Sequence, residues 1–198
     1  MTLVQISKGN TKTGRIPAVS LHPSGTCSKA LPCWRDCYAR KACRYSPEAD
    51  KTWMRNYKLQ AKPAGRIAYF EQISAYVAKH RPRFFRWHVA GDIPDKDYLR
   101  HMKAIAKRHP GTKFLAFTKR HDLALGVLPG NLSIVLSMWV GFGNPNKNRK
   151  QARCWVRDSK DLDHRIPADA LECSGNCETC GLCWELRSIG RDVVINKH

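Results

Sequence analysis

The chain has 198 residues, with 35 lysines and arginines against 16 aspartates and glutamates, so its net charge is +19. A charge of this size favours polyanionic partners, and we expect nucleic acid or a nucleotide-like ligand. No stretch approaches the length of a membrane-spanning helix, about 20 apolar residues, so we expect no association with a membrane.

Nine cysteines require a chemical explanation in a chain of this length. Residues 1–8 turn polar at once, as expected of a cytoplasmic protein without a signal peptide. Closely spaced cysteines in a reducing compartment indicate metal or redox chemistry more often than disulfides. We therefore interpret the cysteines first as candidate metal ligands.

Residues 1–26 carry scattered glycine, proline and charge, which predicts an extended lead-in with at most one short strand. Cys27, Cys33 and Cys37 follow, separated by five and then three residues. This spacing is too open for a zinc knuckle and suits a [4Fe–4S] cluster whose fourth iron is open. Helix-forming residues come after Cys37, which should lie at a helix start, where free backbone N–H groups face an anion or cluster.

Two further helices are predicted before the middle of the chain. Pro47 begins the first, with Glu48 and Asp50 in its first turn. The second begins near Pro63, and its spacing predicts one buried face. That face comprises Ile67, Phe70, Ile73, Ser74 and Val77.

Strands and helices then alternate. Apolar and aromatic residues predict strands over 84–89, 113–118 and 132–137. Helices are predicted over 95–108, where Asp95 is the cap, and over 121–125. Short links between alternating elements indicate right-handed βαβ units and a parallel sheet.

The carboxyl ends of these strands carry the candidate ligand-binding residues, because parallel α/β sheets bind ligands at that edge. Each residue of this set follows or ends a predicted strand, so we expect all of them to share one edge. The set is Gly91, Asp92, Thr118, Lys119 and Ser137.

Residues 141–150 form a basic, glycine-rich and asparagine-rich stretch, the best candidate for a linker between 1–150 and a cysteine-rich segment at 151–198. That segment is predicted to be loop-rich, with a closing strand over 192–197. It contains Cys173, Cys177, Cys180 and Cys183. These four thiols could bind zinc, bind a second cluster, or complete the ligand set of the first.

Several motifs together resemble a known family. The three-cysteine loop before a helix and the strand ending in Ala-Gly-Asp resemble the radical S-adenosylmethionine enzymes. The closer likeness is to small phage-encoded proteins, the gene product 88 family, whose members look like reduced relatives of that superfamily. The matching motifs are Cys27, Cys33 and Cys37 with Tyr38-Ala39-Arg40, then 86–92, 117–119, Cys180 with Cys183-Trp184, and 196–198.

The resemblance implies a partial parallel (βα) barrel over 1–150 with the cysteine-rich extension at 151–198, in the host cytoplasm. It also implies that an open iron binds the amino and carboxylate groups of S-adenosylmethionine. Gly91 and Asp92 would steady that amino group, and Thr118, Lys119 and Ser137 would line the substrate edge. The cysteine spacing and the acid after Gly91 differ from working radical enzymes, so a cluster is implied more firmly than catalysis.

Two other classes of function stay open. The charge of +19 is also compatible with a metal-stapled nucleic-acid-binding protein that has no catalytic activity. One or two clusters would equally suit electron transfer.

Individual residues also have plainer interpretations. Cys43 and Cys154 are interpreted as packed thiols, and His88 as a hydrogen-bonded structural histidine. Asp92 could simply cap a turn. Only the family likeness draws attention to His198.

Overall fold

The computed structural model describes residues 3–144, 151–158 and 163–197. The helices are α1 (Pro23–Thr26), α2 (Tyr38–Tyr45), α3 (Pro47–Gln60), α4 (Pro63–His80), α5 (Lys96–Arg108), α6 (Cys177–Cys180), the 3-10 helix η1 (Leu182–Trp184) and α7 (Leu186–Ile189). The strands are β1 (Ile6–Ser7), β2 (Ala18–Val19), β3 (Phe84–Trp87), β4 (Lys113–Thr118), β5 (Leu132–Met138), β6 (Arg153–Arg157), β7 (Leu171–Glu172) and β8 (Val193–Asn196).

The described strands form one eight-stranded sheet in the order β1-β2-β3-β4-β5-β6-β8-β7. β1 runs antiparallel to β2, and every other neighbouring pair is parallel. From β2 to β6, each strand lies beside the next strand in the sequence. The predicted α/β fold with a mostly parallel sheet is therefore confirmed, and β6, β7 and β8 extend it from the C-terminal segment.

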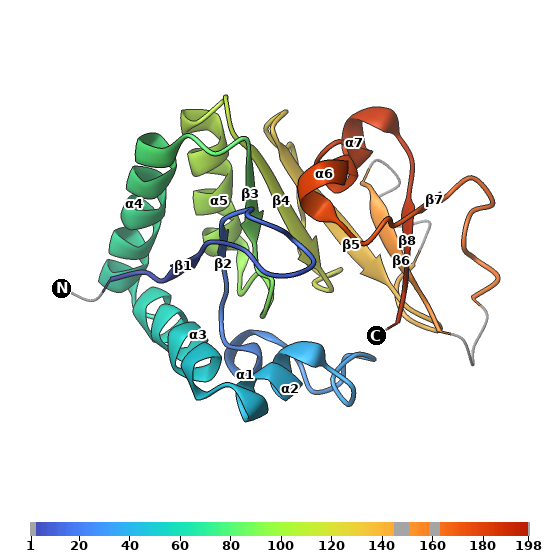
Figure 1. Ribbon diagram of the computed structural model, residues 1–198, viewed down its shortest axis with the longest axis horizontal. Helices are drawn as coiled ribbons and strands as arrows, with labels where there is room; N and C mark the ends of the chain where they lie inside the picture. The colour runs from blue at the N-terminus through green and yellow to red at the C-terminus, as the bar shows by residue number, and fades with distance from the viewer. Residues whose placement is uncertain (1–2, 145–150, 159–162, 198) are drawn as a thin grey trace.

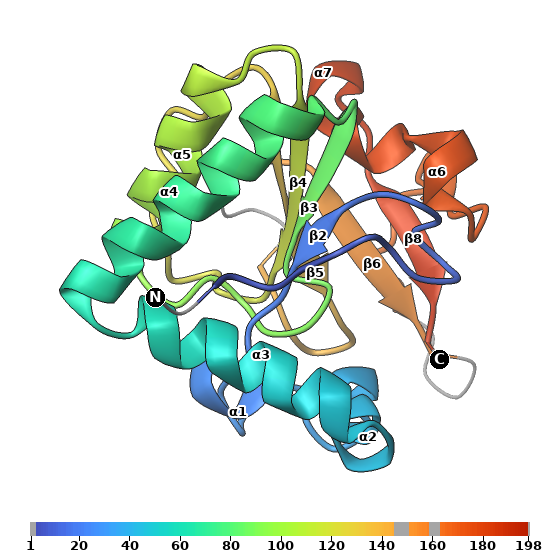
Figure 2. The ribbon, with the colours of Figure 1, turned by 60° about the vertical axis from the view of Figure 1, so that its left-hand side comes forward.

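Helices α4 and α5 lie side by side on one face of this sheet (Figures 1 and 2). Successive strand residues point to opposite faces, so the apolar residues at alternate positions meet these helices. Trp87 of β3 and Phe114 of β4 pack there against Tyr69 and Ile73 of α4 and Tyr98 of α5, and all five are fully buried.

The C-terminal helical segment covers part of the opposite face (Figure 1). Trp184 of η1 donates a hydrogen bond from Nε1 to the carbonyl of Phe85 at 3.3 Å. Its ring lies 4.7 Å from that of Phe84, at the start of β3. Because Trp184 fills this face near the start of β3, the free space lies towards the carboxyl ends of the strands.

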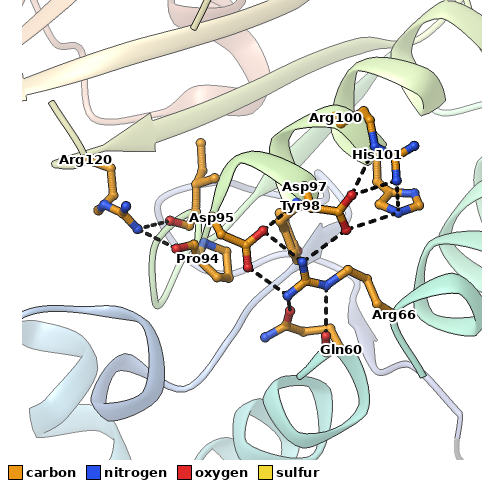
Figure 3. Close-up of polar contacts among 10 residues, drawn as sticks. Gln60, Arg66, Pro94, Asp95, Asp97, Tyr98, Arg100, His101 and Arg120 are labelled. Carbon is orange, nitrogen blue, oxygen red and sulfur yellow. Dashed lines mark hydrogen bonds and ion pairs between the residues drawn. The ribbon is translucent and has the colours of Figure 1, made fainter. Parts of the chain in front are cut away.

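Figure 3 shows the polar contacts that hold the loop between β3 and α5 in place. Arg66 of α4 donates to both carboxylate oxygens of Asp95, each at 2.8 Å, and to the backbone carbonyl of Gln60. Asp95 also caps α5 by accepting from the N–H of Tyr98. Arg120 donates to the Pro94 carbonyl. This loop carries Gly91 and Asp92, so the network positions the predicted ligand edge.

Four expectations for the fold are wrong. Residues 121–125 form turns instead of a helix, and the lead-in contains two strands and α1 instead of one strand at most. Residues 153–157 form a strand inside the sheet, in a region whose basic and polar composition predicts a loop. Ile67 is 53% exposed, so α4 turns a narrower face to the core than the periodicity predicts.

The remaining predicted elements are confirmed, including the helix start at Cys37, which is the N-cap of α2. Most of the candidate linker, residues 145–150, lies outside the described residues, as does His198.

Candidate functional site

A cavity of about 460 Å³ lies between the sheet face opposite α4 and α5 and cysteines from both ends of the chain. Cys27, Cys33 and Cys37, here called the N-terminal thiols, line it together with Cys173, Cys177 and Cys183. Four predicted edge residues also line it, namely Gly91, Asp92, Lys119 and Ser137. Two predicted site residues, Thr118 and Cys180, do not.

Local hydrogen bonds shape the loop that carries the N-terminal thiols. The backbone N–H of Cys27 donates to Pro23 at 2.8 Å and ends α1. The side-chain oxygen of Thr26 accepts from the N–H of Asp92 at 3.1 Å, which joins this loop to the end of β3. At the other end, the Arg40 guanidinium donates to the carbonyl of Trp34 and stacks on its ring. The loop is thus held at both ends before it meets any ligand.

Burial changes the acidity of two of the N-terminal thiols, Cys27 and Cys33. Burial, followed by the charge of Asp92, raises the pKa of Cys27 to about 12. Burial also raises the pKa of Cys33, against the opposing effect of Lys119. Cys27 and Cys33 therefore stay protonated at neutral pH and lack the reactivity of a thiolate. A metal centre displaces the proton directly, so the same burial does not prevent ligation.

Asp92 is the polar centre of the predicted edge. Its carboxylate accepts from the N–H of Ile93 at 2.7 Å, the hydroxyl of Thr118 at 2.5 Å and the N–H of Lys119 at 2.8 Å. The side chain is buried, and this burial outweighs the hydrogen bonds and raises its pKa. Asp92 therefore fastens the ends of β3 and β4 while it faces the cavity.

The other edge residues take different positions. Thr118 alternates with Phe117 and Lys119, so its side chain turns away from the cavity and reaches Asp92 instead. The ammonium of Lys119 lies 5.8 Å from the ring centre of Trp139. Burial lowers the pKa of Lys119, but Cys33 and Asp92 outweigh it and raise that pKa overall.

Arg86 of β3 also lines the cavity and is not among the predicted site residues. Its guanidinium lies 4.9 Å from the ring centre of Phe117. Its Nε is buried and, in the part of the chain that the structure describes, has no hydrogen-bond partner. The alternation along β3, with Phe85 and Trp87 in the core, was the available signal that Arg86 faces the opposite side.

His88 follows β3 with a φ of 57°, a left-handed conformation that is uncommon outside glycine. Its Nε2 lies 3.0 Å from the hydroxyl of Tyr98, which in turn lies 2.8 Å from the hydroxyl of Tyr69. Burial, followed by the charge of Arg86, lowers the pKa of His88 to about 3, so the ring is neutral at neutral pH. The expected structural, hydrogen-bonded histidine is confirmed.

His22, Cys43 and Asp50 lie outside the cavity and bring three ligand atoms within 4.8 Å of one another. However, Nδ1 of His22 accepts from the N–H of Ser24 at 3.2 Å. A metal at Nε2 would leave the ring without a proton, whereas ligating histidines normally donate from their other nitrogen. Nε2 instead lies 2.9 Å from Asp50, so we interpret this group as a fastening between α1 and α3.

The arrangement combines thiol groups, cationic side chains and a buried carboxylate around one cavity, as expected of a metal or cofactor site.

None of the helices in the described segments has both the length and the apolar character required to cross a bilayer. A family model described as gene product 88 matches residues 2–186. No curated protein and no solved structure matches the chain.

Proposed function

The chain belongs to the gene product 88 family, and we propose that Cys27, Cys33 and Cys37 bind a [4Fe–4S] cluster. The resemblance of that family to the radical S-adenosylmethionine enzymes implies such a cluster. The observation that carries this proposal is that all three thiols of one short loop face a single cavity. Iron–sulfur clusters are held by cysteine thiolates in spaced runs of this kind.

The spacing of the sulfur atoms favours a cluster over zinc. Tetrahedral zinc with bonds of about 2.3 Å holds its sulfurs about 3.8 Å apart. Among the described residues, only His22, Cys43 and Asp50 bring three ligand atoms within 4.8 Å. At least one pair of the N-terminal sulfurs therefore lies more than 4.8 Å apart, which is wider than a tetrahedral zinc site requires. In addition, Cys37 makes no side-chain cap to α2, so the first N–H groups of that helix are available to a negative cluster.

We extend the proposal to a reduced relative of the radical S-adenosylmethionine enzymes. The sequential parallel order from β2 to β6 supports a partial (βα) barrel. When bound, such a cluster supplies single electrons and an iron without a protein ligand, to which S-adenosylmethionine binds. Gly91 and Asp92 would line the space that holds the amino group of S-adenosylmethionine. Lys119 and Ser137 would line the side of the cavity where the substrate binds. Thr118 would act as a positioning residue through Asp92.

Metal analysis of anaerobically purified protein tests the cluster. We expect the triple variant C27S/C33S/C37S to hold about four fewer irons and sulfides per chain than the unmodified protein. The matched control is C43S, because Cys43 lies outside the cavity, and its iron content should not change. Iron and sulfide analysis, with visible and EPR spectra, measures both. Zinc in place of iron, or equal iron in the triple variant, would contradict the proposal.

Catalysis has a separate test. The reconstituted protein, given S-adenosylmethionine and dithionite, should release 5′-deoxyadenosine. A protein that holds the cluster but releases none would retain the metal-binding function and lose the enzymatic one.

Nucleic-acid binding is the second candidate function, and the net charge of +19 favours it. Affinity for DNA or RNA should then fall steeply as salt rises, because bound counterions are released from the phosphate backbone. Fluorescence anisotropy with labelled duplex and single-stranded probes, between low and physiological salt, measures this dependence. Binding that is absent for every probe, or insensitive to salt, would exclude this candidate.

A further inference from the structure

Cys154 lies among other thiols and not alone in the core. It is 1% exposed on β6, where its neighbours in register are Ser137 of β5 and Val193 of β8. Its side chain faces the cavity and belongs to a buried cluster against which the partly buried Cys173, Cys177 and Cys183 pack. β6, a strand that was not predicted from the sequence, therefore adds a fourth thiol to these three.

Backbone hydrogen bonds hold two of the other three thiols in place. The N–H of Cys173 donates to Val194 of β8 at 3.0 Å, and the N–H of Cys177 donates to Lys12 at 3.0 Å. Cys183 lies in η1, next to the anchored Trp184. Four positions from separate elements thus present their thiols to one space, as expected of a preformed ligand set.

Cys180 differs from these four. It is exposed and does not line the cavity. It borders only a hollow of about 20 Å³ that it shares with Cys173, Cys177 and Cys183. A space of that size admits about one water molecule and not an inorganic cluster.

Arg86 of β3 lines the same cavity as these four thiols. Its Nε is buried and has no hydrogen-bond partner among the described residues, although the residue as a whole is half-buried. Cysteines bind metals as negatively charged thiolates, so a guanidinium on the same cavity can balance part of their charge.

We propose that Cys154, Cys173, Cys177 and Cys183 bind a second [4Fe–4S] cluster, fully ligated by protein, with Arg86 as its counter-charge. Four thiolates leave no open iron, so this cluster differs from the N-terminal one. Zinc fits less well, because no three of these sulfurs lie within 4.8 Å of one another. The assignment also leaves Cys180 free, in contrast to the ligand set that the sequence spacing predicts.

A pair of single substitutions tests which cysteine is the ligand. The unmodified protein should hold about eight irons per chain. C180S should keep that number and an unchanged EPR spectrum, whereas C154S should lose about half of the iron. Loss of iron in C180S, full retention in C154S, or zinc at this site would each overturn the proposal.

The triple variant C27S/C33S/C37S separates the two cluster proposals. With only the C-terminal site intact, it should retain about four irons, and adding C180S should not lower that number. A triple variant without iron overturns the second cluster and leaves the first intact. Because C154S alters a buried strand, circular dichroism checks its fold. If C154S is unfolded, the iron content of C180S decides whether Cys180 is a ligand. Cys180 is exposed, so its replacement should not disturb the fold.

Discussion

Replacing Asp92 with asparagine should lower the free energy of unfolding by about 3 kcal/mol, although the two side chains have nearly the same size. All three groups that contact the carboxylate are donors, namely the N–H groups of Ile93 and Lys119 and the hydroxyl of Thr118. An amide nitrogen in either oxygen position must face a donor, and rotation of the amide only changes which donor that is. Urea unfolding of both proteins at equal metal content measures the difference.

Asp97→Asn is the matched control for this prediction. Asp97 makes the same type of polar contact, with Arg66 and Arg100, but its side chain is 48% exposed. Water can replace the lost interactions there, so the expected cost is below about 1 kcal/mol. Equal losses in D92N and D97N would show that the three donors around Asp92 do not require a carboxylate.

Strong local patterns predicted the part of the fold on which the site is built. Helix α5 begins after the capping residue Asp95, and β4 spans 113–118, both as expected. These two elements were predicted correctly because their caps, periodicity and turn residues all indicate the same secondary structure. β6 was not predicted because it is short, with only Cys154, Trp155 and Val156 between two arginines. Its pairing with the neighbouring strands β5 and β8 stabilises it, and its own sequence does not indicate a strand.

The candidate site was also predicted only in part. The rule for strand ends placed Gly91, Asp92, Lys119 and Ser137 on one cavity. It could not show that Thr118 turns away, because the rule locates residues along a strand and not on its faces. The alternation of side chains supplies that distinction once the register is known, and it also brings Arg86 and Cys154 to the cavity. Spacing in the sequence favoured Cys180, which the fold places outside the cavity.

Gly91→Ala should cost about 3 kcal/mol of stability and also lower the occupancy of the N-terminal cluster. Gly91 has a φ of +83°, and a Cβ at this position would lie 2.6 Å from the carbonyl oxygen of Leu21 and 2.8 Å from Oγ1 of Thr26. The first atom belongs to the backbone, and the second is a short side-chain hydroxyl held by hydrogen bonds to the His22 carbonyl and the Asp92 N–H. The loop must therefore move, and with it Cys27, the residue after Thr26. Urea unfolding and iron analysis measure the two effects.

Gly111→Ala is the control that isolates this geometry. Gly111 has no heavy atom within 4 Å of an added Cβ, so the same substitution should change stability by less than about 0.5 kcal/mol. If the clash acts through the loop that carries Cys27, G91A should lose iron only from the N-terminal cluster and keep about four irons at the C-terminal thiols. Equal loss from both clusters would indicate general unfolding. A G91A protein with full stability and full iron would show that the end of β3 does not determine the position of the N-terminal thiols.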